Sequence, residues 1–454
     1  MIESVRNAFA LPDLRRKILY TIFLLVIYRL VANIPVPGVD LAFWDALNQG
    51  TQSFGSNSLV GVLNLLSGGA VSNFSVLAMG VYPYITASII IQLLSPVIPF
   101  LKELDSEGES GRNRKNKITY YLTIPLAVLQ AVGQINLVAL SVGTTVAAIL
   151  PNFGFGSAAN ILPTLATLMA MVGGTMFAIW LGELITENGI GQGISLIIFG
   201  GIISQVPQNL IGLTQLDTQT QIFAWVSFVV LTILTILVIV VVQEGQRRIP
   251  VQYGRRVRGR KQYQGQSTHI PLRVNYAGMI PIIFAQSIMT FPGLIASFFL
   301  PEVGTDSSGF LQDIAVGINN TFGQAQGFWY WFIFFLMVFA FTFFYTDVMV
   351  QQQKMPEMLQ RNGGFIPGIR PGKKTEVYIT KVVRRITLVG ALFLAIIAVL
   401  PGIMAAVGYF LNMPELDRST LVLSGSGLII IVGVIIDTMR QLEAQLLMRH
   451  YEGF

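Results

Sequence analysis

Ten stretches of about 20 mostly apolar residues divide the chain, and they limit the folds that it can adopt. A helix of that length crosses the hydrocarbon core of a bilayer while bonding all of its backbone polar groups internally. The stretches are 18–35, 81–100, 118–140, 161–182, 190–212, 222–243, 275–300, 328–349, 386–408 and 421–438. The sequence therefore predicts an all-α polytopic membrane protein with ten transmembrane helices.

The composition excludes most other classes of protein. Hydrophobic residues make up 53% of the chain and charged residues only 11%, whereas about a quarter of the residues in a soluble globular protein are charged. Cysteine is absent, which excludes disulfides and thiolate metal sites. The two histidines, His269 and His450, are far apart in the sequence. We therefore expect no metal and no cofactor.

The cations fix the orientation of the predicted spans. Of the 29 lysines and arginines, 27 fall in the segments 1–17, 101–117, 244–274, 350–385 and 439–454, and none falls in the connections 36–80, 141–160, 213–221 and 301–327. Positive loops stay on the cytoplasmic side. This pattern predicts a cytoplasmic amphipathic N-terminus over 1–17, two long basic cytoplasmic loops over 244–274 and 350–385, and a cytoplasmic tail over 439–454.

The spans divide into two groups of five, residues 18–212 and residues 222–438. Because five is odd, the second group enters the membrane from the opposite face, which predicts two inverted halves with a central path between them. A further apolar piece, 59–80, is interrupted by Gly68 and Gly69 and is too irregular to face lipid. We interpret it as a short re-entrant helix covered by protein or water.

Ionisable residues are nearly missing from the spans, and this argues against several activities. Arg29 is the only clear case, and we expect it to bond neighbouring backbone carbonyls. Coupled transporters and intramembrane enzymes usually need buried carboxylates or a catalytic constellation, so we expect no enzyme. An inverted-repeat secondary transporter is the leading alternative to a channel, and a membrane scaffold without a pore is another.

The two long basic loops offer a surface for an acidic partner. Their turn residues, such as Gly363-Gly364 and Pro371-Gly372, predict ordered structure. Contact with anionic lipid would explain their charge but not their length. The expected docking residues are Arg247, Arg248, Arg255, Arg256, Arg258, Arg370, Lys373 and Lys374. Ribosomal RNA or an acidic motor protein would fit such a surface.

Several motifs closely resemble the SecY family of protein-translocation channels, in the family's order and over essentially the whole chain. They are IPVPGVD (34–40), LLSGGAVSNFSVLAMGVYPYITASIIIQLL (65–94), EGESGRNRK (107–115), ITENGIGQGIS (185–195), GQRRIPVQYGRR (245–256), QSTHIPLRVNYAGMIP (266–281) and FIPGIRPGK (365–373). The resemblance implies a channel for unfolded secretory polypeptides that also releases apolar helices sideways. Because neither end carries a long extension, a bacterial member in the plasma (inner) membrane is expected.

The resemblance also implies a pore narrowed by aliphatic side chains and closed by a plug. The ring would consist of Ile85, Ile89, Ile194, Ile198, Ile283 and Ile430, with Ile429 or Ile431 as alternatives in the last span. The plug would be the re-entrant piece, including Leu65, Leu66, Ser67, Gly68 and Gly69. Residues spaced i and i+4, as in the first two pairs, share a helix face, and a dry aliphatic collar resists ions without a charged gate. Without the resemblance, such isoleucines more often face lipid or neighbouring helices.

The remaining implications concern the lateral gate and the partners. The resemblance places a gate toward lipid between spans two and three on one side and spans seven and eight on the other. Gln92 and Gln130 lie near this seam, and we expect them to tune its closure. The implied partners are the SecE and SecG subunits, the SecA ATPase, the ribosome, secretory preproteins with signal sequences, and membrane lipid. The chain lacks a GxxxxGK[ST] loop, so its energy would come from a partner.

Overall fold

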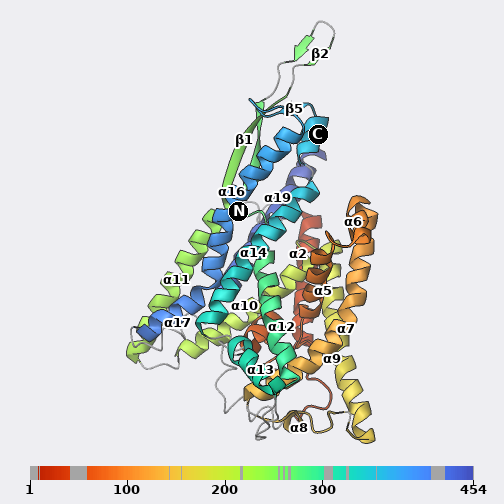
Figure 1. Cartoon of the computed structure of the whole chain (residues 1–454), viewed down its shortest axis with the longest axis vertical. Helices are drawn as coiled ribbons and strands as arrows, with labels where there is room; N and C mark the ends of the chain where they lie inside the picture. Colours follow the sequence, from red (N-terminus) through yellow and green to blue (C-terminus); the bar gives the residue numbers. More distant parts are fainter. Residues whose placement is uncertain are drawn as a thin grey trace.

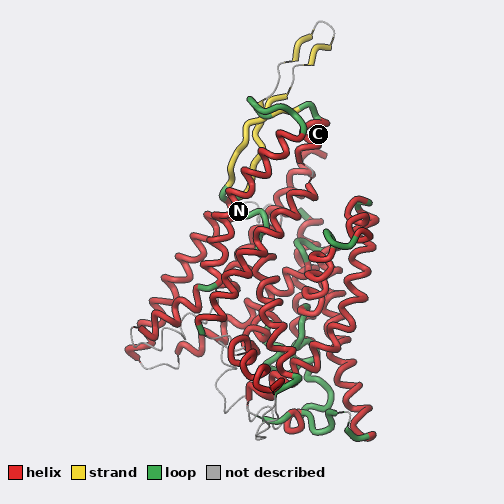
Figure 2. Tube along the Cα trace, in the orientation of Figure 1, coloured by secondary structure: helices red, strands yellow, loops and turns green. Residues whose placement is uncertain are grey.

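The computed structural model describes most of the 454 residues and is mainly helical (Figures 1 and 2). The described residues are 9, 11–40, 59–142, 144–154, 156–214, 218–253, 256–258, 261–263, 267–300, 310–323, 327–353, 355–410 and 425–452. In the first part of the chain the helices are α2 (Pro12–Val31), α4 (Leu59–Ser67), α5 (Tyr82–Leu94), α6 (Pro99–Ser106), α7 (Glu109–Val142), α8 (Val146–Ile149), α9 (Ala158–Asn188) and α10 (Gly193–Thr214).

The second part begins with a long helix and a set of strands. Its helices are α11 (Thr218–Glu244), α12 (Ile280–Ser297), α13 (Phe310–Ile318), the π-helical turn η1 (Asn319–Gly323), α14 (Phe328–Gln353), α15 (Met355–Arg361), α16 (Lys373–Ala398), α17 (Leu400–Phe410) and α19 (Gly425–Glu452). The strands are β1 (Gln246–Tyr253), β2 (Arg256–Arg258), β3 (Lys261–Tyr263), β4 (Ser267–Arg273) and β5 (Gly364–Phe365).

Length and apolar composition qualify four described helical stretches as membrane spans: Glu109–Leu140, Ala158–Asn188, Ile280–Ser297 and Phe328–Arg361. The number rises to six if each of two bent helix pairs is one span. Gly193–Pro207 and Phe228–Glu244 are apolar helices of shorter length. The ten spans therefore stay a prediction, and the last of them, 421–438, begins before the described part of α19.

Two predicted spans differ from the observed helices at bends. The second, 81–100, is α5 followed by α6, and the two axes meet at 100°. Pro96 and Pro99 lie at this corner, and proline can neither donate a backbone hydrogen bond nor continue a helix from within. The ninth, 386–408, begins earlier as α16, and α17 is bent from α16 by 50° at a break next to Pro401.

The helices pack in two groups that follow the chain. In the first group α9 contacts α2, α7 and α10, and α7 contacts α5; in the second, α14 contacts α12 and α16, and α19 contacts α11 and α16. Contacts between the groups run from α12 to α5 and α7, from α10 to α11 and α19, and from α4 to η1. The interface thus has two seams, and the largest buried cluster draws side chains from both groups around it.

The two basic loops meet in one small sheet. Strands β1 and β4 form an antiparallel hairpin with Ile249 opposite Ile270, and β5 from the other loop pairs with the end of β1. Figure 1 shows β1 and β5 at the same end of the molecule as α6, and α8 and α13 at the opposite end. Ile249, Val251 and Leu272 pack with residues of α15 and α16 in a separate apolar cluster, so this sheet has its own core.

Candidate functional site

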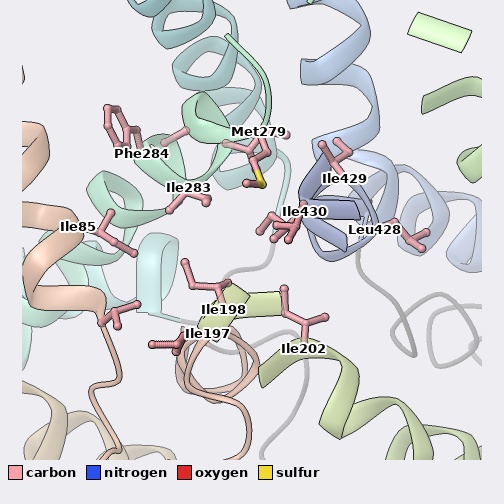
Figure 3. Packing of buried hydrophobic residues seen from close by; sticks show 14 of the residues in the cluster. Ile85, Ile197, Ile198, Ile202, Met279, Ile283, Phe284, Leu428, Ile429 and Ile430 are labelled. Atoms are coloured by element: carbon pink, nitrogen blue, oxygen red, sulfur yellow. The ribbon is translucent and has the colours of Figure 1, made fainter. Parts of the chain in front are cut away.

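An aliphatic collar lies where the two groups of helices meet. Ile85 and Ile89 from α5, Ile198 from α10, Ile283 from α12 and Ile430 from α19 are all at most 7% exposed and belong to one buried cluster. Ile194, one turn before Ile198, is partly buried against the same cluster. Figure 3 shows Ile85, Ile198, Ile283 and Ile430 reaching toward a common centre from four different helices. The predicted ring residues are therefore brought together.

Helix packing selects one isoleucine from the run in α19. Ile429 and Ile430 are both buried, and Ile431 is partly buried against the same cluster. In Figure 3 Ile430 points toward Ile198 and Ile283, while Ile429 leaves the helix in another direction and Leu428 lies on the opposite side. Met279, which directly precedes α12, and Phe284 of α12 lie on either side of Ile283 in the same view. The collar is therefore lined by branched and unbranched apolar side chains, which neither donate nor accept strong hydrogen bonds.

The interrupted piece 59–80 packs against the collar. It begins as α4 and continues after Ser67 in turns, in which Gly68 and Gly69 have φ values of 71° and 86°. Ala70 and Leu77 belong to the same buried cluster as the collar. A Cβ on Gly68 would lie 2.6 Å from Cα of Gly201 in α10, so this position needs glycine both for its φ and for its close approach. The side chains of Leu65 and Leu66 lie outside the described residues.

One seam between the two groups is closed by few polar contacts. The Tyr82 hydroxyl of α5 donates to the Ser287 carbonyl of α12 at 2.7 Å. The Ser297 hydroxyl of α12 donates to the Leu294 carbonyl of its own helix at 2.7 Å and lies 3.3 Å from the Gly133 carbonyl of α7. A Cβ on Gly133 would lie 2.7 Å from Cδ2 of Leu294, so α7 and α12 are close there. We therefore describe the α5–α7–α12 seam as the candidate gate.

The two glutamines predicted to tune the gate do not bond across this seam. The Gln130 amide donates to the Thr86 hydroxyl at 3.2 Å, from α7 to α5, and no described partner satisfies its Oε1. The Gln92 amide donates to Ser88 of its own helix at 3.2 Å. Both bonds stay within the first group of helices. The Tyr82 bond does cross the seam, but the sequence marks Tyr82 only as one of two tyrosines at the start of α5.

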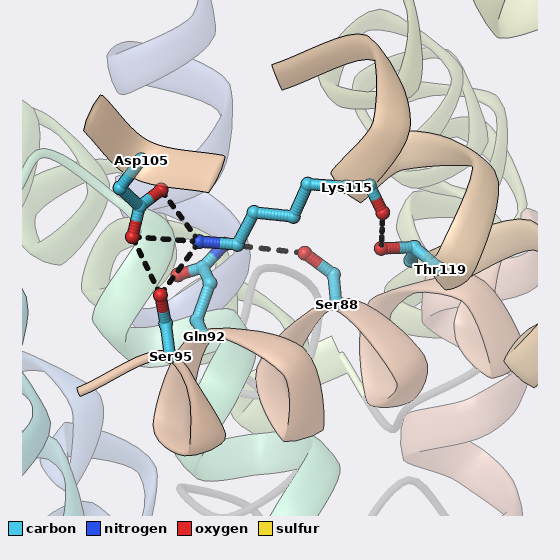
Figure 4. Close-up of polar contacts among 6 residues, drawn as sticks. All are labelled: Ser88, Gln92, Ser95, Asp105, Lys115 and Thr119. Atoms are coloured by element: carbon cyan, nitrogen blue, oxygen red, sulfur yellow. Dashed lines mark hydrogen bonds and ion pairs between the residues drawn. The ribbon is translucent and has the colours of Figure 1, made fainter. Parts of the chain in front are cut away.

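A polar corner joins the ends of the helices on one side of the candidate gate (Figure 4). The Lys115 ammonium of α7 donates to the Asp105 carboxylate of α6 at 2.9 Å and to the Ser95 hydroxyl at 3.0 Å. The Ser95 hydroxyl in turn donates to Asp105 at 2.5 Å. The Lys115 side chain is only 16% exposed, so this pair is better shielded from water than an ordinary surface ion pair. The contacts fasten α5, α6 and α7 to one another.

The predicted docking residues lie on or beside the sheet. The side chains of Arg247, Arg248, Arg370, Lys373 and Lys374 are exposed. Arg370 precedes α16, and its carbonyl accepts a hydrogen bond from the Thr375 hydroxyl at 3.0 Å, which fixes the turn. Arg256 and Arg258 lie on β2, whose pairing with β3 is described while their side chains are not; Arg255 lies outside the described residues. Among the described residues no group of three or more potential metal ligands occurs.

Comparisons with known proteins identify the fold and the family. The fold resembles that of a solved protein-conducting channel, with a TM-score of 0.59, 17% identity and coverage of 94% of this chain and 91% of that one. A second solved structure, Sec61 in the canine ribosome–channel complex from the endoplasmic reticulum, gives a TM-score of 0.58 at 16% identity and covers the same shares. At such identities the likeness concerns the fold alone.

Sequence relatives carry the assignment further. The SecY family model matches residues 75–439. The protein translocase subunit SecY of Halalkalibacterium halodurans is 40% identical over 464 aligned positions, covering all of both chains, and that of Thermotoga maritima is 39% identical, covering all of this chain and 98% of its own. The fold is thus of the protein-conducting channel class. The chain belongs to the SecY family and is a subunit of a protein translocation channel, as the motifs predicted; the secondary-transporter alternative is not supported.

Proposed function

We propose that this chain passes unfolded secretory polypeptides outward through the collar and releases apolar helices sideways into lipid through the α5–α7–α12 seam. One observation carries the proposal: buried isoleucines from four helices of both groups converge on one centre, with the turns after α4 packed on the same cluster. A collar without hydrogen-bonding groups offers little chemical preference, so chains of many sequences can slide through it. Aliphatic side chains also exclude water and ions from a narrow opening.

The topology belongs to the same proposal. Ten spans in two inverted halves, 18–212 and 222–438, would place both termini and the loops 244–274 and 350–385 in the cytoplasm of a bacterium, with the chain in its inner membrane. The cation distribution supports this orientation, because Lys and Arg are retained on the cytoplasmic side. The piece 59–80 would be the plug that closes the pore from outside.

Crosslinking to a stalled secretory chain tests the path. Photoreactive residues at Ile89 and Ile283, both at most 6% exposed, should crosslink to the stalled chain at least tenfold more than residues at Leu94 and Ile295 of the same helices, which are 38% and 42% exposed. Proximity in the pore is the reason, because the control positions face away from the cluster. Equal yields from both pairs, or no yield at Ile89 and Ile283, would contradict the path.

Lateral release makes a separate prediction about the seam. Tyr82→Phe removes a hydrogen bond that crosses from α5 to α12, worth about 1 kcal/mol, and so should favour the open seam about fivefold. Secretion of a preprotein with a weakened signal sequence should rise accordingly. The Gln92→Leu/Gln130→Leu double variant is the comparison, since its bonds lie within the first group. If secretion of this preprotein changed in the double variant but not in Tyr82→Phe, control of the gate would lie in the contact between α5 and α7 instead.

The partners are proposed from the shape and charge of the basic loops. Sec61 and Ssh1, which share this fold, have been solved bound to ribosomes. We infer that the sheet built from β1, β4 and β5, with exposed Arg247 and Arg248 on its first strand, receives ribosomal RNA or the SecA ATPase. SecE and SecG would complete the channel in the membrane. The driving energy would come from one of these partners, which makes this chain a conduit and no enzyme.

A further inference from the structure

The end of α4 is held by side chains from two other helices. Asn64, Ser67 and Gly68 lie where α4 ends, and the last carbonyls of a helix have no partner within it. The Tyr28 hydroxyl of α2 donates to the Ser67 carbonyl at 3.2 Å, and the Arg29 guanidinium donates to the Gly68 carbonyl. These bonds join residues that are 39 positions apart in the chain.

The other side of α4 is bonded from α10. The Gln205 amide donates to the Asn64 carbonyl at 2.6 Å. The Ser204 hydroxyl donates to the Gly201 carbonyl of its own helix at 2.7 Å and lies 3.4 Å from the Gly68 carbonyl. Tyr28 and Gln205 are 3% and 7% exposed, so these bonds are shielded from water. Tyr28 and Arg29 therefore satisfy the Ser67 and Gly68 carbonyls, and Gln205 adds a second bond to the Asn64 carbonyl, which also accepts from the Gly69 backbone N–H at 2.9 Å.

Arg29 adds a charge to this arrangement. A helix ends in a partial negative charge, and a cation placed at that end is favourable, more so when the pair is partly buried. Arg29 is half-buried, and its bond to Gly68 agrees with the expectation that it binds neighbouring carbonyls. If α4 moved away, Arg29 would lose that partner at a site where unsatisfied charges are costly. The charge therefore favours the position of α4 against the collar.

We propose that Arg29, Tyr28 and Gln205 form a latch that holds the plug in place and so sets how readily the resting channel opens. The proposal rests on the proposed function, because it takes the piece 59–80 as the plug. The three side chains donate hydrogen bonds to backbone carbonyls of the plug and not to its side chains. The latch therefore depends on where α4 ends and on the two glycines that follow it, Gly68 and Gly69.

The chain contains no cysteine, so a single introduced thiol reports the position of the plug without interference. Ser67 is 2% exposed and is converted to Cys with little change in volume. Ser67→Cys is labelled with a membrane-impermeant maleimide in vesicles, in the parent chain and in variants of the latch. We expect Arg29→Gln to raise the labelling rate at least tenfold and Arg29→Lys to raise it less, because lysine keeps the charge but not the fork of donors.

Two further variants test the latch even if Arg29→Gln does not fold. Tyr28→Phe and Gln205→Leu each remove one latch bond while leaving the charge, and each should raise labelling several-fold. Arg384→Gln is the matched control: it breaks the 3.2 Å pair between Arg384 of α16 and Asp347 of α14, and labelling should stay at the parent rate. Rates within twofold of the parent in all three latch variants would overturn the latch.

Resting ion conductance separates this inference from the proposed function. If deletion of residues 59–67 raises conductance while the latch variants change neither conductance nor labelling, the plug stands and the latch is wrong. If the latch variants raise labelling while the deletion leaves conductance unchanged, the side chains do hold this piece, and its role as the plug is wrong instead.

Discussion

Serine at the four collar positions that face one another is expected to make the channel leak. The variant Ile85→Ser/Ile198→Ser/Ile283→Ser/Ile430→Ser replaces buried aliphatic groups with hydroxyls. A buried hydroxyl without a partner costs about 1–3 kcal/mol, so these hydroxyls recruit water into the constriction. A wetted constriction no longer resists ions. With residues 59–67 deleted, so that α4 no longer covers the collar, ion flux into proteoliposomes should rise at least tenfold over the same deletion with the native isoleucines.

The same four helices supply the control. Leu94, Ile203, Ile295 and Ile435 lie on α5, α10, α12 and α19 and are each at least 38% exposed. Serine at these positions lowers the hydrophobicity of each helix by a similar amount without touching the collar. The flux of this control should match the parent deletion. A comparable leak from both sets would show that loss of helix packing, and not a wet collar, admits ions.

Reversal of one exposed charge is expected to uncouple the channel from the SecA ATPase that we propose as its motor. Arg370 lies in the turn before α16, and the bond from Thr375 to its carbonyl keeps the backbone in place whatever the side chain. Arg370→Glu therefore reverses the charge at this position while the backbone of the turn stays in place. Placing like charges together at a protein interface costs several kcal/mol, so SecA-driven translocation of a preprotein should fall at least tenfold. Crosslinking of an already stalled chain to Ile283 should be unaffected, because the collar is unchanged.

Lys117→Glu is the matched charge reversal for this experiment. Lys117 is also exposed and lies in the basic segment at the start of α7, but it is not among the proposed docking residues. Its translocation rate should stay within about twofold of the parent, and Arg370→Lys should restore part of the lost rate. Equal losses from both reversals would point to the total positive charge of the cytoplasmic face rather than to a docking site at Arg370.

Local composition predicted the membrane class because its causes act along short stretches of chain. A bilayer selects apolar segments of about 20 residues and retains cations on one side, and both signals can be counted without knowing any contact. The bends at Pro96 and Pro401 were missed, since the apolar runs continue through them while the helices do not. The collar residues are implied by the family resemblance, because nothing in an apolar span marks which isoleucine faces a neighbour.

The site also shows where sequence reasoning stopped. Gln92 and Gln130 were chosen as polar residues near a seam, yet each bonds within its own group of helices, while Tyr82 makes the crossing contact. The polarity of a buried side chain indicates that it needs a hydrogen-bond partner, but it does not indicate which residue that partner is. That choice depends on the rotation of α5 against α12, which the packing of many side chains sets together.

The sequence by itself determined the membrane class and the family, and it predicts the side on which the charges gather. These properties follow from the order of the residues and from the preference of apolar segments for the bilayer and of cations for water. Only the tertiary structure decided that Ile430 rather than Ile429 faces the collar, and that Arg29 bonds the carbonyl of Gly68, 39 residues away. The physical reason is that these contacts join separate helices, whose rotation and depth are fixed by close packing and by the need to satisfy carbonyls where α4 ends.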